Sequence, residues 1–230
     1  SRRKKALEDY FDRDPELESV FKAEGAAGKL ERIAPPAVNV SFVRQPEMLG
    51  TGHALLQASP WLGGEPCVVA YPDDLHFGSP PLARQLMDVY ERTGCSVLSG
   101  LHEPGDVSRY GVIDPAPDGV HVRGFVEKPA PGTEPSREIS LGRYLYTPEF
   151  FEILAEGWAR HTGGEYYHAY ALDRLIAAGK VAWAPVTGTR LDTGDPSGFL
   201  DALLRYAWED PGYRGVLESF FREKMERPVR

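Results

Sequence analysis

A glutamate and a lysine stand side by side at Glu127 and Lys128, at the end of a segment with the composition of a β-strand. A carboxylate can accept hydrogen bonds from two hydroxyl groups, and a lysine ammonium binds a phosphate as a compact point charge. Together the two groups suit a sugar phosphate. Taken alone, the pair is better explained as a solvated strand end, and only the other motifs favour a sugar-phosphate site.

Two aspartates follow separate predicted strands. Asp73 comes after the apolar run 67–71, and Asp192 comes after a predicted strand at 181–186. Ligands of open α/β sheets bind at the carboxyl ends of the strands, where the two carboxylates could converge. Mg²⁺ on a nucleotide's phosphates needs only one or two protein carboxylates, so both residues are candidate metal ligands. Each alone also fits a turn, Asp192 as an Asx turn before Gly194.

Gln45 ends a predicted strand and precedes a glycine turn. Its amide offers both a donor and an acceptor, which match the edge of a uracil or thymine. Gly50 and Gly52 have no side chain, so the backbone there can approach a flat ring closely. These residues are candidates for a pyrimidine site, although an ordinary polar loop has the same composition.

Alternating strands and helices must position these side chains. The pattern predicts a strand at 38–44, a strand buried on both faces at 67–71, a helix around 82–90 and a strand from 97. This order predicts a doubly wound, mainly parallel sheet.

The second half of the chain has a different pattern. Shorter strands are predicted at 111–114, 120–127 and 140–146, which suggests an inserted antiparallel portion. The elements predicted after it are a helix from 147, a helix at 166–178, a strand at 181–186, a helix capped at 195–196 and a last amphipathic helix at 216–225.

Bulk composition excludes several classes of protein. The 230 residues, 42% of them hydrophobic, fit one large α/β domain or two small ones. A net charge of −8 argues against a nucleic-acid or membrane-surface binder. Cys67 and Cys95 form no metal-spacing motif and are expected to be buried free thiols. Without a membrane-length apolar run or a secretory signal, a cytoplasmic location is expected.

The motifs occur in the order and spacing of bacterial UTP–glucose-1-phosphate uridylyltransferases. The opening residues 1–12 also resemble the family's helix S-R-x-K-K-x-I-E-D-x-F-D. The resemblance implies a Rossmann-like α/β/α nucleotidyltransferase domain over residues 1–208, followed by a C-terminal helix over 209–230. The stretches that carry it are 42–45, 49–54, 72–74, 108–113, 126–129 and 142–144.

The resemblance also implies roles on the nucleotide side of the site. Gln45 and Gly50 match the positions that contact uracil. Asp73 matches the Mg²⁺ ligand, and Asp192 matches the second carboxylate of the wider family. The expected partners are therefore UTP with Mg²⁺.

On the sugar side, Gly111 matches the glycine whose backbone meets the sugar. Glu127 matches the residue that holds glucose hydroxyls, and Lys128 the residue that holds the sugar's phosphate. The implied reaction converts UTP and glucose 1-phosphate into UDP-glucose and diphosphate, with Asp73, Lys128 and Asp192 as the catalytic group.

Departures from the family pattern keep alternatives open. Residues 164–172 replace the usual G-E-I-Q-L-T-D-A-I, where His168 is expected to be a surface or packing histidine. Residues 191–194 read L-D-T-G, as in thymidylyltransferases, so a thymidylyl- or other sugar-phosphate nucleotidyltransferase is the first alternative.

The family's glycine-rich G-x-G-T-R-x-x-P-x-T-K does not occur in residues 1–230. The chain is therefore expected to lack the N-terminal phosphate-loop portion, and an inactive sugar-nucleotide-binding protein is the second alternative. Family resemblance suggests a dimer or tetramer. Phe220, Phe221 and Met225 are a candidate contact surface, unless their helix packs on its own domain.

Overall fold

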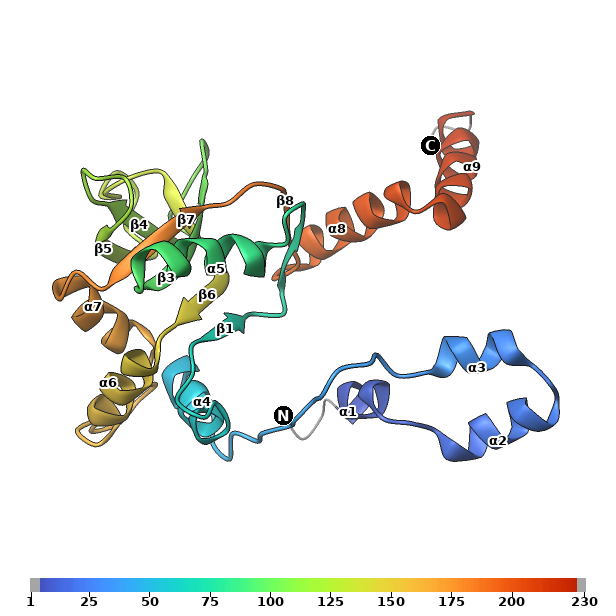
Figure 1. Cartoon of the computed structure of the whole chain (residues 1–230). Helices are drawn as coiled ribbons and strands as arrows, with labels where there is room; N and C mark the ends of the chain where they lie inside the picture. Colours follow the sequence, from blue (N-terminus) through green and yellow to red (C-terminus); the bar gives the residue numbers. More distant parts are fainter. Residues whose placement is uncertain (1–4, 227–230) are drawn as a thin grey trace.

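The computed structural model describes residues 5–226, and its centre is a six-stranded sheet (Figure 1). The strands lie in the order β5-β4-β6-β3-β7, and β1 pairs with the second half of β6. Their bounds are β1 (Cys67–Ala70), β3 (Ser96–His102), β4 (Gly111–Pro115), β5 (Val122–Glu127), β6 (Glu138–Tyr146) and β7 (Val181–Pro185).

Strand β6 determines the character of this sheet. It runs antiparallel to β1, β3 and β4, and only β3 and β7 pair in parallel within residues 5–226. The predicted mixed sheet in an α/β fold is confirmed, but the expectation of mainly parallel pairing is wrong for these residues. Strands β1, β3 and β7 do run the same way, but β6 lies between β1 and β3 and pairs with both in antiparallel fashion.

Helix α5 (Leu82–Thr93) covers one face of the sheet. Its side chain Leu86 is fully buried in a cluster with Val97 of β3 and Leu145 of β6. The predicted helix around 82–90 is confirmed, and it ends at Gly94 in the left-handed conformation that favours glycine.

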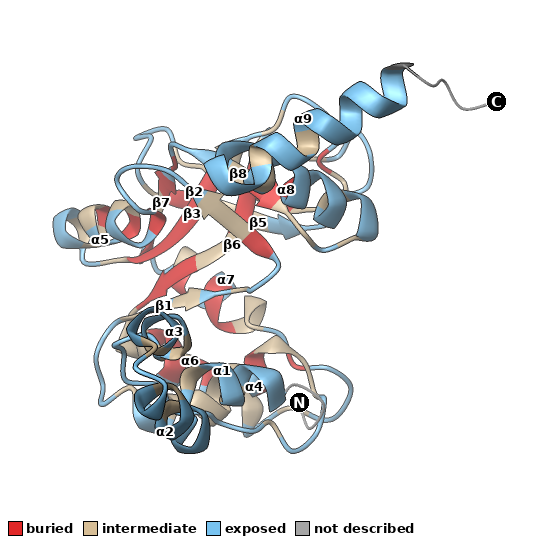
Figure 2. Ribbon diagram, turned by 90° about the vertical axis from the view of Figure 1, so that its right-hand side faces the viewer, coloured by how far each residue is buried: buried red, intermediate tan, exposed pale blue. Residues whose placement is uncertain are grey.

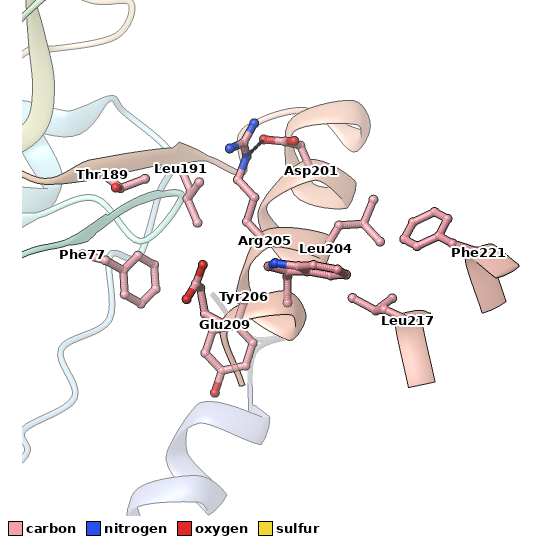
Figure 3. A pocket seen from close by; sticks show the side chains of 11 residues that line it. Phe77, Thr189, Leu191, Asp201, Leu204, Arg205, Tyr206, Glu209, Leu217 and Phe221 are labelled. Carbon is pink, nitrogen blue, oxygen red and sulfur yellow. Dashed lines mark hydrogen bonds and ion pairs between the residues drawn. The ribbon is translucent and has the colours of Figure 1, made fainter. Parts of the chain in front are cut away.

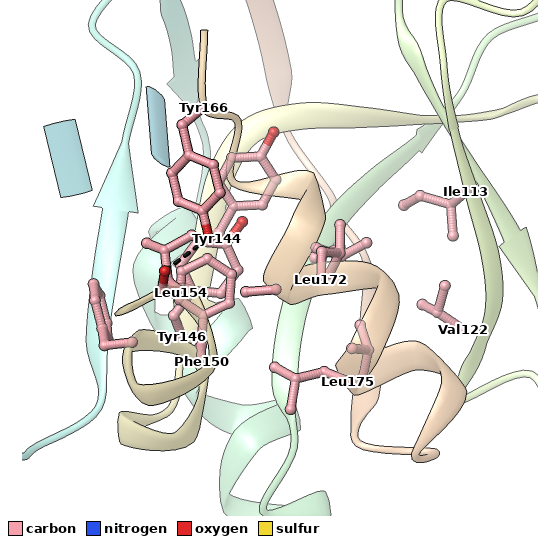
Figure 4. Packing of buried hydrophobic residues seen from close by; sticks show 13 residues of the cluster. Ile113, Val122, Tyr144, Tyr146, Phe150, Leu154, Tyr166, Leu172 and Leu175 are labelled. Atoms are coloured by element: carbon pink, nitrogen blue, oxygen red, sulfur yellow. Dashed lines mark hydrogen bonds between the residues drawn. The ribbon is translucent and has the colours of Figure 1, made fainter. Parts of the chain in front are cut away.

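Helices α6 (Pro148–Trp158) and α7 (Ala169–Ala177) cover the opposite face (Figure 4). Tyr144 and Tyr146 point to this side because neighbouring residues of a strand alternate between faces. The ring of Tyr146 stacks on Phe150 with centroids 3.6 Å apart. The sheet is therefore the middle of three layers, as predicted.

The N-terminal segment lies apart from this core (Figure 1), and its helices are largely exposed (Figure 2). Helices α1 (Lys5–Phe11), α2 (Pro15–Ala23) and α3 (Ala27–Ile33) contain no buried residue. The predicted strand at 38–44 is wrong, because within the described residues no strand lies beside it to pair with its backbone. Residues 1–4 of the family-like opening lie outside the described part.

A two-stranded antiparallel ribbon stands at the side of the sheet. It consists of β2 (Asp74–Phe77) and β8 (Thr189–Asp192), which are far apart in sequence. Neither strand was predicted. Short strands of four residues give little periodicity, and each lies next to a glycine-containing turn that suggested a loop.

Strand β1 differs from its prediction in burial. Its side chains alternate between half-buried and exposed instead of being buried on both faces. Cys67 and Cys95 are both free, as predicted, but both are only half-buried. None of the helices within residues 5–226 has the length and apolar character needed to span a membrane.

The remaining helices lie beside α6 and in a C-terminal arm (Figure 1). Helix α4 (Thr51–Ala58) begins at the glycine turn and continues into the short η1 (Ser59–Trp61). Helices α8 (Pro196–Glu209) and α9 (Pro211–Glu226) form an arm that extends from the ribbon (Figure 1). The predicted boundary at 208–209 falls at the end of α8, and the division into a domain and a C-terminal helix stays a prediction.

Candidate active site

A cavity of about 750 Å³ opens beside the ribbon, the start of β4, the end of β5 and the middle of β6. Asp73, Gly111, Glu127, Lys128 and Asp192, predicted from five separate positions in the sequence, all line it. Gln45 and Gly50 line a smaller neighbouring cavity of about 300 Å³. The two cavities share Thr51 and Tyr167 in their walls, so they are adjacent parts of one region.

The turns that carry the two predicted metal ligands are tied together. Thr193 donates to the backbone oxygen of Asp73 from its N–H (2.8 Å) and from its hydroxyl (2.9 Å). A Cβ atom on Gly194 would lie 3.1 Å from Asp192 Oδ1 and 3.7 Å from Asp73 Oδ2. Both carboxylates therefore border one small space. Asp73 reaches it even though β1, the strand before it, pairs with β6 in antiparallel and not in parallel fashion.

The surroundings of Asp73 and Asp192 fit a divalent cation. The Asp73 side chain is exposed and accepts no hydrogen bond from residues 5–226. Asp192 Oδ1 accepts the N–H of Gly194 at 3.0 Å. Within the described residues, no group of three or more His, Cys, Asp or Glu offers another metal site. Mg²⁺ needs no larger cluster, because water and phosphate oxygens complete its shell.

Arg190 lies between two carboxylates on the ribbon. Its Nε donates to Asp74 Oδ1 (3.0 Å), and its Nη2 donates to Asp74 Oδ2 (3.1 Å) and to Asp192 Oδ2 (3.2 Å). The guanidinium carbon lies 5.0 Å from the centre of the Tyr110 ring. Burial lowers the pKa of Arg190, but the hydrogen bonds and negative charge of Asp74 outweigh it, so the pKa is raised.

On the opposite wall, Gly111 faces Glu127 across the β4–β5 pair. A Cβ atom on Gly111 would lie 2.9 Å from Glu127 Oε2 and would collide with the ring of Phe125. The absence of a side chain at Gly111 therefore leaves room for the Glu127 carboxylate. The carboxylate is exposed and forms no ion pair within residues 5–226, so it is free to accept hydrogen bonds from a ligand.

Lys128 has an unusual backbone conformation. Its φ of 48° is the only positive φ of a non-glycine residue in the described part of the chain. The N–H of Lys128 donates to the backbone oxygen of Tyr110 at 3.0 Å, which holds the end of β5 against the loop before Gly111. Strained residues of this kind cluster at functional sites. The ammonium forms no ion pair within residues 5–226.

The glycine turn is clamped against the loop before α7. The N–H of Tyr166 donates to Leu49 O (2.7 Å), and the N–H of Gly52 donates to Tyr166 O (2.8 Å). Gln45 Nε2 donates to Gly50 O at 3.1 Å and lies 3.0 Å from His53 Nδ1. The predicted pyrimidine-contacting residues therefore lie together in a preformed turn.

His168, in the segment that departs from the family pattern, packs into the cavity wall. Its Nδ1 lies 3.1 Å from both Thr51 Oγ1 and Tyr71 Oη, and its ring packs near Tyr144. Burial lowers the pKa of His168 to about 4, so the ring is neutral at physiological pH. A packing role, as predicted, fits these contacts.

Relatives of this chain include enzymes that share one name. The chain is 40% identical over 226 residues to the UTP–glucose-1-phosphate uridylyltransferase of Staphylococcus epidermidis RP62A, which covers 96% of this chain and 78% of the relative. The enzyme of Staphylococcus haemolyticus is 38% identical over the same shares. Residues 6–209 match the nucleotidyl transferase family. The chain belongs to the nucleotidyl transferase family.

Solved structures agree with this family assignment. The UTP-bound UGPase from Acinetobacter baumannii superposes with a TM-score of 0.82 at 27% identity, over 95% of this chain and 78% of that one. A UDP-glucose pyrophosphorylase complexed with UDP-glucose gives 0.75 at 31% identity, over 91% and 79%. The resemblance noted from the motifs is confirmed.

Sequence reasoning about this nucleotidyl transferase missed part of the cavity wall. Arg190 and Tyr110 were not singled out, although both line the cavity. A signal for Arg190 existed: it stands two residues before Asp192, and residues two apart on a strand share a face. Tyr110 lies within the family-like stretch 108–113, but its stacking on Arg190 depends on the fold.

Proposed function

We propose that this nucleotidyl transferase converts UTP and α-D-glucose 1-phosphate into UDP-glucose and diphosphate. The observation that carries the proposal is the cavity that joins Asp73 and Asp192 to Glu127 and Lys128. Carboxylates for a metal and a glutamate–lysine pair for a sugar phosphate lie in one space. Relatives at 40% and 38% identity bear the name UTP–glucose-1-phosphate uridylyltransferase.

The reaction is an in-line displacement at phosphorus. A phosphate oxygen of glucose 1-phosphate forms a bond to the α-phosphorus of UTP. The bond from that phosphorus to the β-phosphate oxygen breaks, and diphosphate leaves with the electron pair. The attacking oxygen is already ionised, so no general base is required. The protein must hold two anions together, and the Lys128 ammonium reduces their repulsion.

Each end of the sugar phosphate has a matching group. Glu127 accepts hydrogen bonds from glucose hydroxyls, and Gly111 lets the sugar approach the backbone of β4. Lys128 binds the phosphate as a point charge. Glu127 and Lys128 are neighbours in sequence and line the same cavity, so one short segment would serve both ends of the ligand.

Mg²⁺ is the proposed cofactor, and Asp73 and Asp192 would hold it. Their carboxylates border one space and Asp73 has no competing partner in the described part of the chain. When bound, the ion neutralises phosphate charge in the transition state.

The uracil base is proposed to lie at the glycine turn, against Gly50 and Gln45. The L-D-T-G sequence at 191–194 favours thymidine nucleotides only by resemblance. The structure supplies another reason for its threonine, since Thr193 ties Asp192 to Asp73 through two hydrogen bonds to one backbone oxygen. We therefore keep UTP as the proposed nucleotide.

The direct test measures diphosphate release from the purified protein with glucose 1-phosphate, Mg²⁺ and either UTP or dTTP. UDP-glucose should form in equal amount to diphosphate, with a higher kcat/KM for UTP. A preference for dTTP would support the thymidylyl alternative. Binding of UDP-glucose without turnover of any nucleotide would support an inactive sugar-nucleotide-binding protein.

We also propose that the protein is a homo-oligomer that uses the α8–α9 arm. A cavity of about 710 Å³ separates α8 from the ribbon, and Phe221 and Leu217 of α9 line it (Figure 3). Helix α9 thus packs partly on its own chain.

Phe220 and Met225 are 50% and 84% exposed. Light scattering should give a dimer or tetramer mass, and F220D should reduce it; a monomer mass for the wild type would contradict the proposal.

A further inference from the structure

The ribbon presents three carboxylates to the active-site cavity, and their environments differ. Asp74 and Asp192 face each other in the β2–β8 register, and Asp73 precedes β2 in the adjoining turn. Asp74 is buried and both of its oxygens accept hydrogen bonds from Arg190. Its Oδ2 also accepts the N–H of Gly142 at 3.1 Å. Asp73, by contrast, is exposed.

Arg190 is placed to act on two of these carboxylates at once. Its side chain is only 12% exposed, as is that of Asp74, while the Asp192 side chain is 32% exposed. It reaches Asp192 through Oδ2 alone, so Oδ1 remains turned toward the space beside Gly194 that Asp73 also borders. The guanidinium therefore occupies the cation position between Asp74 and Asp192.

Arg190 also connects the two walls of the cavity. Its guanidinium stacks on Tyr110, whose backbone oxygen accepts the N–H of Lys128. Tyr110 immediately precedes Gly111 in the sequence. Arg190 is thus linked to the proposed metal site through Asp192, and to the proposed sugar site through Tyr110 and Lys128.

We propose that Arg190 is a positioning residue that holds Asp192, occupies Asp74 and so confines the divalent cation to the space between Asp73 and Asp192. Without Arg190, Asp74 is an unpaired carboxylate next to two others. Its oxygens then compete with Asp73 and Asp192 for the cation, and the net charge of the site is one unit more negative. The inference rests on the proposed function only for the identity of the reaction; the metal binding that it predicts is measurable without substrate.

Charge-matched variants separate these effects. In R190Q, Mn²⁺ used as the probe should bind about tenfold more tightly, or a second ion should bind, because a carboxylate within a few ångströms loses its counter-charge. The double variant D74N/R190Q has the same site charge as the wild type, so its Mn²⁺ affinity should return to the wild-type value. Both R190Q and the double variant should have a lower kcat than the wild type, because Arg190 no longer positions Asp192.

Mn²⁺ binding is followed by calorimetry and by the electron paramagnetic resonance signal of the free ion. R123Q serves as the control, because Arg123 forms a comparable two-point pair with Asp114 outside the cavity. It should leave both Mn²⁺ affinity and kcat unchanged. Circular dichroism checks that each variant is folded.

Two results would overturn the assignment: wild-type Mn²⁺ binding in R190Q, or tight binding that persists in D74N/R190Q. If R190Q does not fold, D74N decides, since its asparagine still accepts the Gly142 N–H. Mn²⁺ binding in D74N should weaken by no more than the roughly tenfold that one lost negative charge accounts for; complete loss of binding would make Asp74 a metal ligand and refute the proposal. Should Mn²⁺ binding change as expected in a protein that makes no UDP-glucose, the proposed function fails and the assignment of Arg190 stands.

Discussion

Gly111 and Glu127 lie directly opposite each other in the antiparallel pair of β4 and β5, and the absence of a side chain at one leaves room for the carboxylate of the other. Nothing in the backbone conformation requires glycine at 111, since its φ is not in the left-handed region. The requirement is steric. It links the identity of residue 111 to the position of the Glu127 side chain in the cavity.

Gly111→Ala should therefore impair use of glucose 1-phosphate. The new methyl group displaces Glu127 Oε2 and the Phe125 ring, and we expect KM for glucose 1-phosphate to rise about tenfold or more while KM for UTP changes little. Gly124→Ala on the same hairpin is the control, because its Cβ would meet Asp114 Cβ at an ordinary 3.4 Å. Equal effects of the two variants would remove Gly111 from the sugar site.

Glu127→Gln should weaken glucose 1-phosphate more than UTP. A carboxylate accepts at both oxygens, whereas the amide must donate at one position, which leaves a poorly paired contact. The loss in kcat/KM for glucose 1-phosphate should be on the order of 10²-fold or more. Initial rates with each substrate varied in turn decide the point, and equal losses for both substrates would place Glu127 elsewhere.

Asp73→Asn should reduce turnover severely and leave the fold intact. The exposed carboxylate contributes no hydrogen bond to the structure from residues 5–226, so its replacement costs little stability, while loss of a metal ligand costs several kcal/mol of transition-state stabilisation. Thermal unfolding and kcat at saturating Mg²⁺ test both parts. Near-normal turnover of a stable variant would rule Asp73 out as the ligand.

The sequence alone placed most of the site but not its geometry. Asp73, Glu127 and Lys128, predicted from separate motifs, do line one cavity, because each stands at or shortly after the end of a strand. The β2–β8 ribbon was not foreseen, since its two strands are more than one hundred residues apart and each has only four residues. Pairing at such separation leaves no periodic signal in a short segment.

The elements that were predicted wrongly from the sequence have physical explanations. The alternation of Val38, Val40 and Phe42 met the rule for a strand, but periodicity says nothing about whether a partner strand is present. The apolar run at β1 suggested burial on both faces, yet alternate residues are exposed. Parallel pairing was inferred from alternating elements, and β6 intervenes between strands that run the same way.

Neutral His168 should make stability depend on pH. Burial lowers its pKa in the folded protein to about 4, whereas an unfolded histidine titrates near 6.5. Between these values the unfolded state binds more protons, so the contribution is fully present above about pH 6.5 and is lost as the pH falls toward 4. The loss amounts to roughly 2–3 kcal/mol of unfolding free energy.

Urea unfolding of the wild type and H168Q between pH 7.5 and 4.5 measures this contribution. Glutamine can still hydrogen-bond to Thr51 or Tyr71 but does not titrate, so the difference between the two proteins should shrink or reverse as the pH falls. H102Q is the matched control, because the His102 side chain is 62% exposed. Parallel pH profiles for the wild type and H168Q would show that His168 is not protonated on unfolding.

Gly50→Ala should both destabilise the protein and weaken UTP binding. Gly50 has a φ of 92°, and a Cβ there would lie 2.5 Å from the backbone oxygen of Tyr166 and 2.8 Å from its nitrogen. The clamp between the glycine turn and the loop before α7 would have to open.

Gly64→Ala is a close control, since Gly64 has a φ of 76° but open space around its Cβ position. Both variants place an alanine at a positive φ, at a cost of roughly 1–3 kcal/mol, and the ψ of 174° at Gly50 lies in a region used almost only by glycine. Only Gly50→Ala adds the collision, worth roughly 1–3 kcal/mol more. Urea unfolding and KM for UTP measure the two effects. Equal losses of stability would mean that the clamp adapts to a side chain, and a large stability loss with an unchanged KM for UTP would separate the glycine turn from the base site.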